Sequence, residues 1–193
     1  MNYNSVALSG LPCSGKTSLC DELVLALRLD WQTHSIGGLF RERYKFWRGE
    51  NLSRENIKFE EYWAKHVKDE DIREVNNEAG ELLKKGKMIL DSRYAAVNAK
   101  DINSTLLIFL TCSLETRINR SLLKYRDKSP DEICSILLER EQDECRRGQE
   151  LYGNLFGGEY DYRDPEFYHL VLNTDAGKLS IDEEVKLILS ALA

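Results

Sequence analysis

The sequence predicts an α/β fold in which a parallel sheet is covered by helices on both faces. Short apolar runs alternate along the chain with longer amphipathic segments. A glycine-bearing turn joins the first apolar run to the first amphipathic segment, and 193 residues suffice for one such domain but not for two full-sized ones. We therefore treat residues 1–193 as a single domain whose ligand crevice lies at the carboxyl ends of the strands.

The first half of the chain predicts two strands and at least four helices. Ser5–Ser9 is typical of a buried strand, and leucines at helical spacing follow it. Gln32–Ile36 predicts a second strand, and the aromatic-rich helix after it could fold over a substrate. Between about residues 49 and 87 the polar sequence predicts two helices, the first after Ser53 around Ile57, Tyr62 and Trp63.

The second half predicts three more strands. Met88–Asp91 and Leu106–Thr111 are compact apolar runs, as expected of central parallel strands. Ser129 and Pro130 form a typical helix start, because serine caps the first turn and proline suits its first position. The other expected elements are a helix after Ser113, the end of the long helix near Tyr152, a loop over 153–165, a strand over His169–Leu172 and a helix over Ile181–Leu192.

Composition excludes several function classes. A formal net charge of −6 disfavours a broad surface for nucleic acid or anionic membranes. No apolar run approaches the ~20 residues that span a bilayer, and the first residues do not resemble a signal peptide, so a cytoplasmic protein is the default expectation. The five cysteines have no CxxC spacing, which indicates free thiols.

The turn after the first strand carries a phosphate-binding motif. Residues Gly10–Thr17 read GLPCSGKT, which fits G-x-x-x-x-G-K-[ST] between a predicted strand and a predicted helix. Backbone N–H groups of such a P-loop point at phosphate oxygens, and Lys16 is expected to reach the β- and γ-phosphates of ATP. The nucleotide-binding candidates are Gly10, Cys13, Ser14, Gly15, Lys16, Thr17 and Ser18.

Two residues are candidates for holding Mg²⁺. The hydroxyl of Thr17 is the usual magnesium ligand of a P-loop. Asp91 ends an apolar strand, where its carboxylate would face the crevice and hold the ion directly or through water. The alternative for Asp91 is that it only caps the next helix.

Arginines are expected to matter, because phosphoryl transfer depends on positioning and charge neutralisation. Arg140 and Arg147 lie seven residues apart on the predicted long helix and therefore share one face. Interleaved acids leave open that these are solvated i,i+4 pairs, such as Arg140 with Glu144. Arg41 and Arg93 lie where an acceptor phosphate would bind, or they are ordinary surface charges.

Segments along nearly the whole chain carry a family resemblance. They are residues 8–17, Ser35–Glu42, Met88–Arg93, Leu137–Glu141 with Arg146 and Arg147, Glu150–Gly153 and Leu170–Thr174. In order and spacing they resemble the cytidylate kinase family, in particular its short archaeal-type branch among the nucleoside monophosphate kinases.

The resemblance implies a five-stranded parallel sheet, Mg-ATP as phosphoryl donor and CMP or dCMP as acceptor. It implies that Arg41 and Arg93 hold the acceptor monophosphate, while Arg140 and Arg147 act from a mobile lid. The helical acceptor-binding insertion would span about residues 38–87, and the lid with its following loop about 129–165. Asp161, in that loop, is a further candidate for touching the acceptor, although a solvated loop residue is the simpler interpretation.

Several positions depart from the family pattern. Gly38 stands where an acid is common, and Ser92 replaces a glycine at the strand end and so adds a side chain close to the crevice. Asp143 occupies a position where the bacterial branch has further lid arginines, and His169 replaces a strand acid. These changes leave other acceptors open, namely AMP, UMP or a small phosphorylated or hydroxyl metabolite. A non-catalytic ATP-binding module is the remaining alternative. We expect a monomer that acts on a small-molecule nucleotide.

Overall fold

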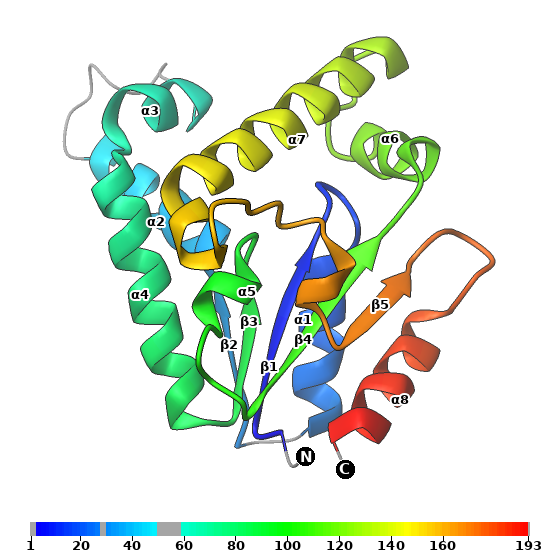
Figure 1. Cartoon of the computed structure of the whole chain (residues 1–193). Helices are drawn as coiled ribbons and strands as arrows, with labels where there is room; N and C mark the ends of the chain where they lie inside the picture. Colours follow the sequence, from blue (N-terminus) through cyan, green and yellow to red (C-terminus); the bar gives the residue numbers. More distant parts are fainter. Residues whose placement is uncertain (1–2, 28–29, 50–58, 193) are drawn as a thin grey trace.

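The computed structural model describes residues 3–27, 30–49 and 59–192, which form a five-stranded sheet between helices (Figure 1). Every strand pair is parallel, and the strand order is β2-β3-β1-β4-β5. The strands are β1 (Ser5–Gly10), β2 (Gln32–Ser35), β3 (Met88–Asp91), β4 (Thr105–Thr111) and β5 (Leu170–Asn173). The predicted fold class and the five parallel strands are confirmed.

Side chains of the central strand alternate between two separate cores. Val6 and Leu8 of β1 face a core shared with α1 (Lys16–Leu27) and α8 (Ile181–Leu192). Ala7 faces the second core, built with α4 (Asp69–Lys85) and α5 (Ala95–Asn98). Because successive strand residues point to opposite faces, both faces of the sheet are buried, which explains the continuous apolar runs.

Helix α2 (Ile36–Gly49) follows the edge strand β2 and contacts both α4 and α3 (Phe59–His66) (Figure 1). Their contact is aromatic, with ring centroids of Phe40 and Trp63 4.8 Å apart and those of Trp47 and Tyr62 5.0 Å apart. Aromatic residues therefore fix the position of these helices beside the crevice. The expected helix start at Ser53 and Ile57 lies outside the described residues.

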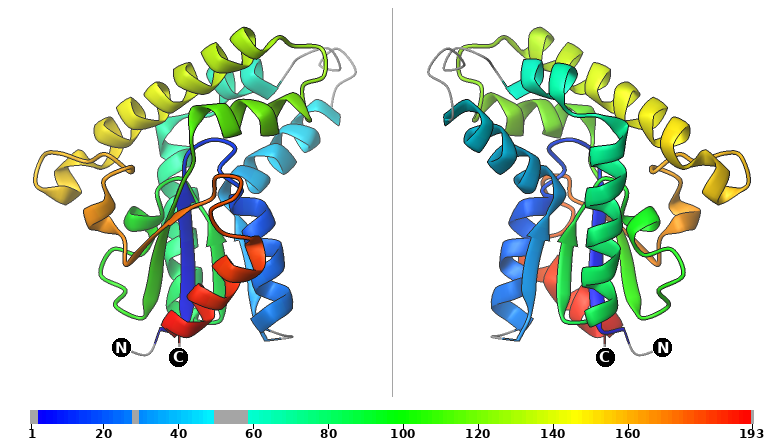
Figure 2. Two further views of the ribbon diagram at one scale, coloured as in Figure 1. Left: turned by 90° about the vertical axis from the view of Figure 1, so that its right-hand side faces the viewer. Right: turned by 90° about the vertical axis from the view of Figure 1, so that its left-hand side faces the viewer.

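Two helices lie across the carboxyl ends of the strands. Figures 1 and 2 show α7 (Pro130–Tyr152) crossing above this end of the sheet, with α6 (Leu114–Leu122) beside it. The start of α7 is the predicted one, since Ser129 and Glu132 form a reciprocal capping box. The chain then returns through two short 3₁₀ turns, Gly153–Phe156 and Pro165–Phe167, to β5.

Three features differ from the sequence prediction. Helix α2 begins at Ile36 rather than after it, because the Ser35 hydroxyl accepts a hydrogen bond from Gly38 N at 3.1 Å and so caps the helix. Strand β5 begins at Leu170, while His169 precedes it and accepts from Leu107 N through Nδ1. The four-residue helix α5 was not predicted, because so short a segment shows no periodicity.

Candidate active site

The P-loop adopts a conformation that requires glycine at its first position. A Cβ atom on Gly10 would lie 2.5 Å from the Leu110 carbonyl oxygen, and Gly10 and Gly15 have φ angles of +149° and +96°. The loop joins β1 to the first turn of α1, and the N–H groups at the start of a helix are available to bind an anion. The residues that were predicted to bind nucleotide, from Gly10 to Ser18, thus lie in one loop and the first helical turn.

Lys16 lies folded over this loop. Its Nζ donates to the carbonyl oxygens of Gly10 and Leu11, at 3.0 and 3.1 Å. Burial, together with the nearby charge of Arg93, lowers the pKa of Lys16 to about 7. A phosphate anion at this point would favour the protonated ammonium, which burial in the ligand-free protein disfavours.

Thr17, Asp91 and Ser35 bring three oxygen-bearing side chains together. Thr17 Oγ1 donates to Asp91 Oδ2 at 3.0 Å, and Ser35 Oγ lies 3.5 Å from the same oxygen. The sheet register explains the meeting, because Asp91 of β3 pairs with Leu8 of β1 and with Ser35 of β2. Hydroxyl and carboxylate oxygens suit Mg²⁺, so the predicted pair of metal ligands fits that ion and Ser35 adds a hydroxyl beside it.

Arg93 extends from the end of β3 towards the P-loop. Its NH1 donates to the carbonyl oxygen of Gly10, the same oxygen that Lys16 contacts. Its guanidinium carbon lies 5.3 Å from the centre of the Tyr162 ring, and its side chain is only 13% exposed. The residue predicted to hold the acceptor phosphate therefore lies in contact with the loop predicted to hold the donor.

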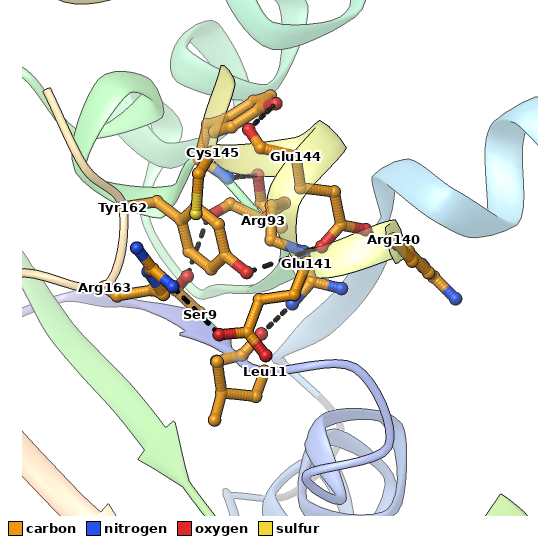
Figure 3. Close-up of polar contacts among 12 residues, drawn as sticks. Ser9, Leu11, Arg93, Arg140, Glu141, Glu144, Cys145, Tyr162 and Arg163 are labelled. Carbon is orange, nitrogen blue, oxygen red and sulfur yellow. Dashed lines mark hydrogen bonds and ion pairs between the residues drawn. The ribbon is translucent and has the colours of Figure 1, made fainter. Parts of the chain in front are cut away.

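Glu144 of α7 lies between two of the predicted arginines (Figure 3). Its carboxylate contacts Arg93 Nε at 2.8 Å and accepts from Arg140 Nε at 2.9 Å. Burial opposes the charge of Arg93, but Glu144 together with Tyr162, Asp91 and Tyr94 outweighs that effect, so the pKa of Arg93 lies above its ordinary value. Arg140 pairs with Glu144, as the i,i+4 spacing allowed. This pair is more than a solvated surface contact, because Glu144 also contacts Arg93 in the crevice.

The remaining predicted site residues lie apart from this cluster. The guanidinium of Arg147 lies 5.8 Å from the Trp63 ring centre, beside α3. Arg41 is exposed near the start of α2, where a Cβ on Gly37 would lie 3.4 Å from its NH1. Asp161 pairs with Arg163 at 2.6 Å and lies 3.6 Å from the Cys145 thiol. The ligand roles predicted for Arg147, Arg41 and Asp161 stay predictions.

A second ion-pair network lies behind α7. Glu141 contacts Arg117 of α6 at 3.0 Å and Arg163 of the following loop at 2.9 Å, and Arg117 is 6% exposed. Removing one partner of a buried ion pair leaves an uncompensated charge. This network joins α6, α7 and the loop after α7, and Figure 3 shows the part formed by Glu141 and Arg163.

Ser92 was expected close to the crevice, but its side chain is engaged in the protein interior. It is buried, and its hydroxyl donates to Asn98 Oδ1 of α5 at 2.5 Å while accepting from Tyr94 N. Asn98 in turn donates to Asn76 of α4. The extra side chain thus packs against α5.

Sequence reasoning missed several residues at the P-loop. Arg120 of α6 donates to the Cys13 carbonyl at 3.4 Å and to Thr174 Oγ1 at 3.1 Å. Thr174 in turn donates to the Ser14 carbonyl at 2.8 Å. The sequence signal that could have identified Arg120 is its position one turn after Arg117, in the helix that follows a central strand. Ser35 and Glu144 were also missed as site residues, the latter because its pairing looked like a surface contact.

The fold and the cations around its phosphate loop define a P-loop kinase, a phosphotransferase whose chemistry depends on charge neutralisation. A family model described as an AAA domain matches residues 6–147. The cytidylate kinase of Pyrobaculum aerophilum is 32% identical over 184 residues, which cover 95% of this chain and 90% of that protein. The chain belongs to the cytidylate kinase family.

Solved structures share the fold at low sequence identity. A protein from Eubacterium ventriosum, described as uncharacterized, has a TM-score of 0.66 and 15% identity over 97% of this chain and 96% of its own. The shikimate kinase from Bacteroides thetaiotaomicron has a TM-score of 0.59 and 16% identity, covering 97% of each chain. Within the described residues, no helix combines the length and the apolar character needed to cross a membrane.

Proposed function

We propose that the protein is an ATP:nucleoside-monophosphate phosphotransferase that transfers the γ-phosphoryl group of ATP to CMP or dCMP. The observation that carries the proposal is that Lys16 and Arg93 share the Gly10 carbonyl. One cation belongs to the donor phosphates and the other is placed for the acceptor phosphate, so the two phosphates would meet at one point. Such placement provides most of the catalysis that in-line phosphoryl transfer needs.

Lys16 and the lid arginines neutralise charge in this mechanism. Lys16 leaves the Gly10 and Leu11 carbonyls to contact the donor phosphates, and Arg140 approaches the transferring group from α7. Thr17 and Asp91 are placed to hold Mg²⁺, which would neutralise phosphate charge when bound. Arg147 completes the predicted transition-state set from the same helix.

A phosphate acceptor agrees better with the crevice than a neutral hydroxyl does. A phosphate oxygen is already anionic near neutral pH, whereas an alcohol needs a general base. The two carboxylates next to Lys16 and Arg93 are both engaged, Asp91 with Thr17 and Glu144 with Arg93. The family's name and this site chemistry together support a nucleoside monophosphate, and cytosine as its base is the most specific part of the proposal.

The test is ADP release from Mg-ATP in a coupled assay with CMP, dCMP, UMP, AMP, GMP or no acceptor. We expect strong dependence on CMP or dCMP, and a loss of at least about 10³-fold in turnover for Lys16→Ala, because the principal cation at the transferring group is gone. Lys186→Ala, a change at an exposed position of α8, is the control and should leave turnover unchanged.

Three other results would contradict the proposal at different points. Faster turnover with AMP or UMP would keep the enzyme class and change the acceptor base. A flat panel with tight ATP binding would indicate an acceptor outside the panel or a module without catalysis. Unchanged turnover in Lys16→Ala would refute the assigned mechanism.

A further inference from the structure

The carboxylate of Glu144 occupies a position with the features of an anion site. It contacts Arg93 Nε at 2.8 Å and Arg140 Nε at 2.9 Å, and the hydroxyl of buried Tyr162 lies 3.5 Å from it. The backbone of α7 is fixed at Glu144, because the hydroxyl of Tyr94, which lies just before α5, donates to the Glu144 carbonyl at 2.9 Å. Two cations and one hydroxyl thus surround a single carboxylate (Figure 3).

An acceptor phosphate would have to share Arg93 with Glu144 in this arrangement. A bidentate contact with phosphate uses two neighbouring N–H groups of the guanidinium fork. NH1 of Arg93 already donates to Gly10, and Nε faces Glu144. Within the described part of the chain, that Nε has the ion-pair contact but no well-directed hydrogen bond.

Glu144 is the contact that has to give way. A carboxylate and a phosphate dianion beside the same arginine repel each other, whereas the neutral Gly10 carbonyl does not repel phosphate. Glu144 is on α7, which lies across the crevice, and its side chain remains 20% exposed, so it has room to turn outward.

We propose that Glu144 is an internal substitute for the acceptor phosphate, which holds α7 against Arg93 in the ligand-free protein and is displaced when an acceptor bearing a phosphate monoester binds. The proposal rests on the proposed function, since it assigns Arg93 to the acceptor. It also makes Glu144 a specificity-determining residue. A neutral hydroxyl metabolite cannot replace the carboxylate charge beside Arg93, so the exchange favours acceptors that carry a phosphate.

The test compares Glu144→Gln with Asp143→Asn as a matched control. Both changes remove one negative charge from the same helix, but the side chain of Asp143 is 75% exposed and forms its ion pair with Arg146, away from Arg93. The donor site is filled with Mg-ADP, so that nothing turns over. The dissociation constants of CMP and, separately, of inorganic phosphate are then measured by calorimetry.

We expect Glu144→Gln to bind both probes about tenfold more tightly than the unchanged protein, because the carboxylate that competes with phosphate for Arg93 has lost its charge. The dissociation constants of Asp143→Asn should stay within about twofold of those of the unchanged protein, since the charge of an exposed side chain is screened by salt. Unchanged or weaker binding in Glu144→Gln would overturn the proposal, because Glu144 would then position Arg93 for the ligand rather than compete with it.

A second measurement needs no variant at Glu144. The Nε–H signal of Arg93, assigned by its loss in Arg93→Lys, should shift when CMP or phosphate saturates the unchanged protein bound to Mg-ADP. An unshifted signal at saturation would overturn the proposal. If CMP binds none of the proteins while phosphate shows the tightening, the acceptor assigned under the proposed function is wrong and the exchange at Glu144 stands.

Discussion

Cys13 adopts the left-handed backbone conformation, with a φ of 62°, in the middle of the P-loop. Such a φ is strained for a residue that carries a Cβ. The thiol has a local contact that offsets part of this strain, because Ser121 Oγ of α6 lies 3.0 Å from Cys13 Sγ. The residue therefore connects the phosphate loop to the helix behind it at the expense of backbone strain.

Replacing Cys13 by glycine and by alanine separates these effects. Both variants lose the thiol, but only alanine keeps the Cβ in the left-handed region. We expect Cys13→Gly to be more stable than Cys13→Ala by about 1 kcal/mol in urea unfolding. Equal stability, or a more stable alanine variant, would show that the loop relaxes to another conformation.

Helix α7 combines strong local signals with close long-range packing. Its capping box and first-position proline fix where it begins, as the sequence predicted. Its position above the crevice depends on Gly148, where a Cβ atom would lie 2.9 Å from Tyr94 Cε1 and 3.5 Å from Tyr160 Cε1. A helix that approaches its neighbours this closely has no space for a side chain there.

Gly148→Ala tests that packing. In an exposed helix this change stabilises by about 1 kcal/mol, but here we expect it to destabilise by about 1–3 kcal/mol, because the added methyl group overlaps the Tyr94 ring. Gly49→Ala in α2 is the control, since a Cβ at Gly49 meets no atom of the described residues within 4 Å, and it should be neutral or slightly stabilising. Chemical denaturation measures both, and a stabilised Gly148→Ala protein would mean that α7 moves away from Tyr94.

At the scale of the whole molecule, the candidate site is assembled from parts that are distant in sequence. The P-loop, the end of β3 and the second half of α7 meet at the carboxyl edge of the sheet (Figure 1). Nucleotide binding at the P-loop should therefore stabilise the folded chain as a unit, because a ligand that binds only the folded state lowers its free energy.

Mg-ADP at one hundred times its dissociation constant should stabilise the protein by about 2.7 kcal/mol. For a chain of this size that corresponds to an increase of about 5–10 °C in the melting temperature. Scanning calorimetry with and without Mg-ADP measures the shift, and Lys16→Ala at the same ligand concentration should show little of it. An equal shift in both proteins would place the nucleotide outside the P-loop.

The regular elements and the P-loop were predictable because their signals are local. Alternating apolar runs gave the five strands, and the spacing of Gly10, Gly15, Lys16 and Thr17 gave the phosphate loop. The less regular features were harder to predict. Helix α5 is too short for a periodicity, and Ser92 was expected at the crevice but is buried because Asn98 and Tyr94 N engage its hydroxyl.

The sequence by itself determined the class of fold, the phosphate loop and the family, because each depends on residues close together or on an ordered series of motifs. Only the tertiary structure decided which charges face one another. Arg93 lies 83 residues from the Gly10 carbonyl that it contacts, and Glu144 reaches it from another element. Sequence spacing shows neighbours along a helix, whereas the pairing of Arg93 with Glu144 depends on how β3 and α7 pack around the crevice.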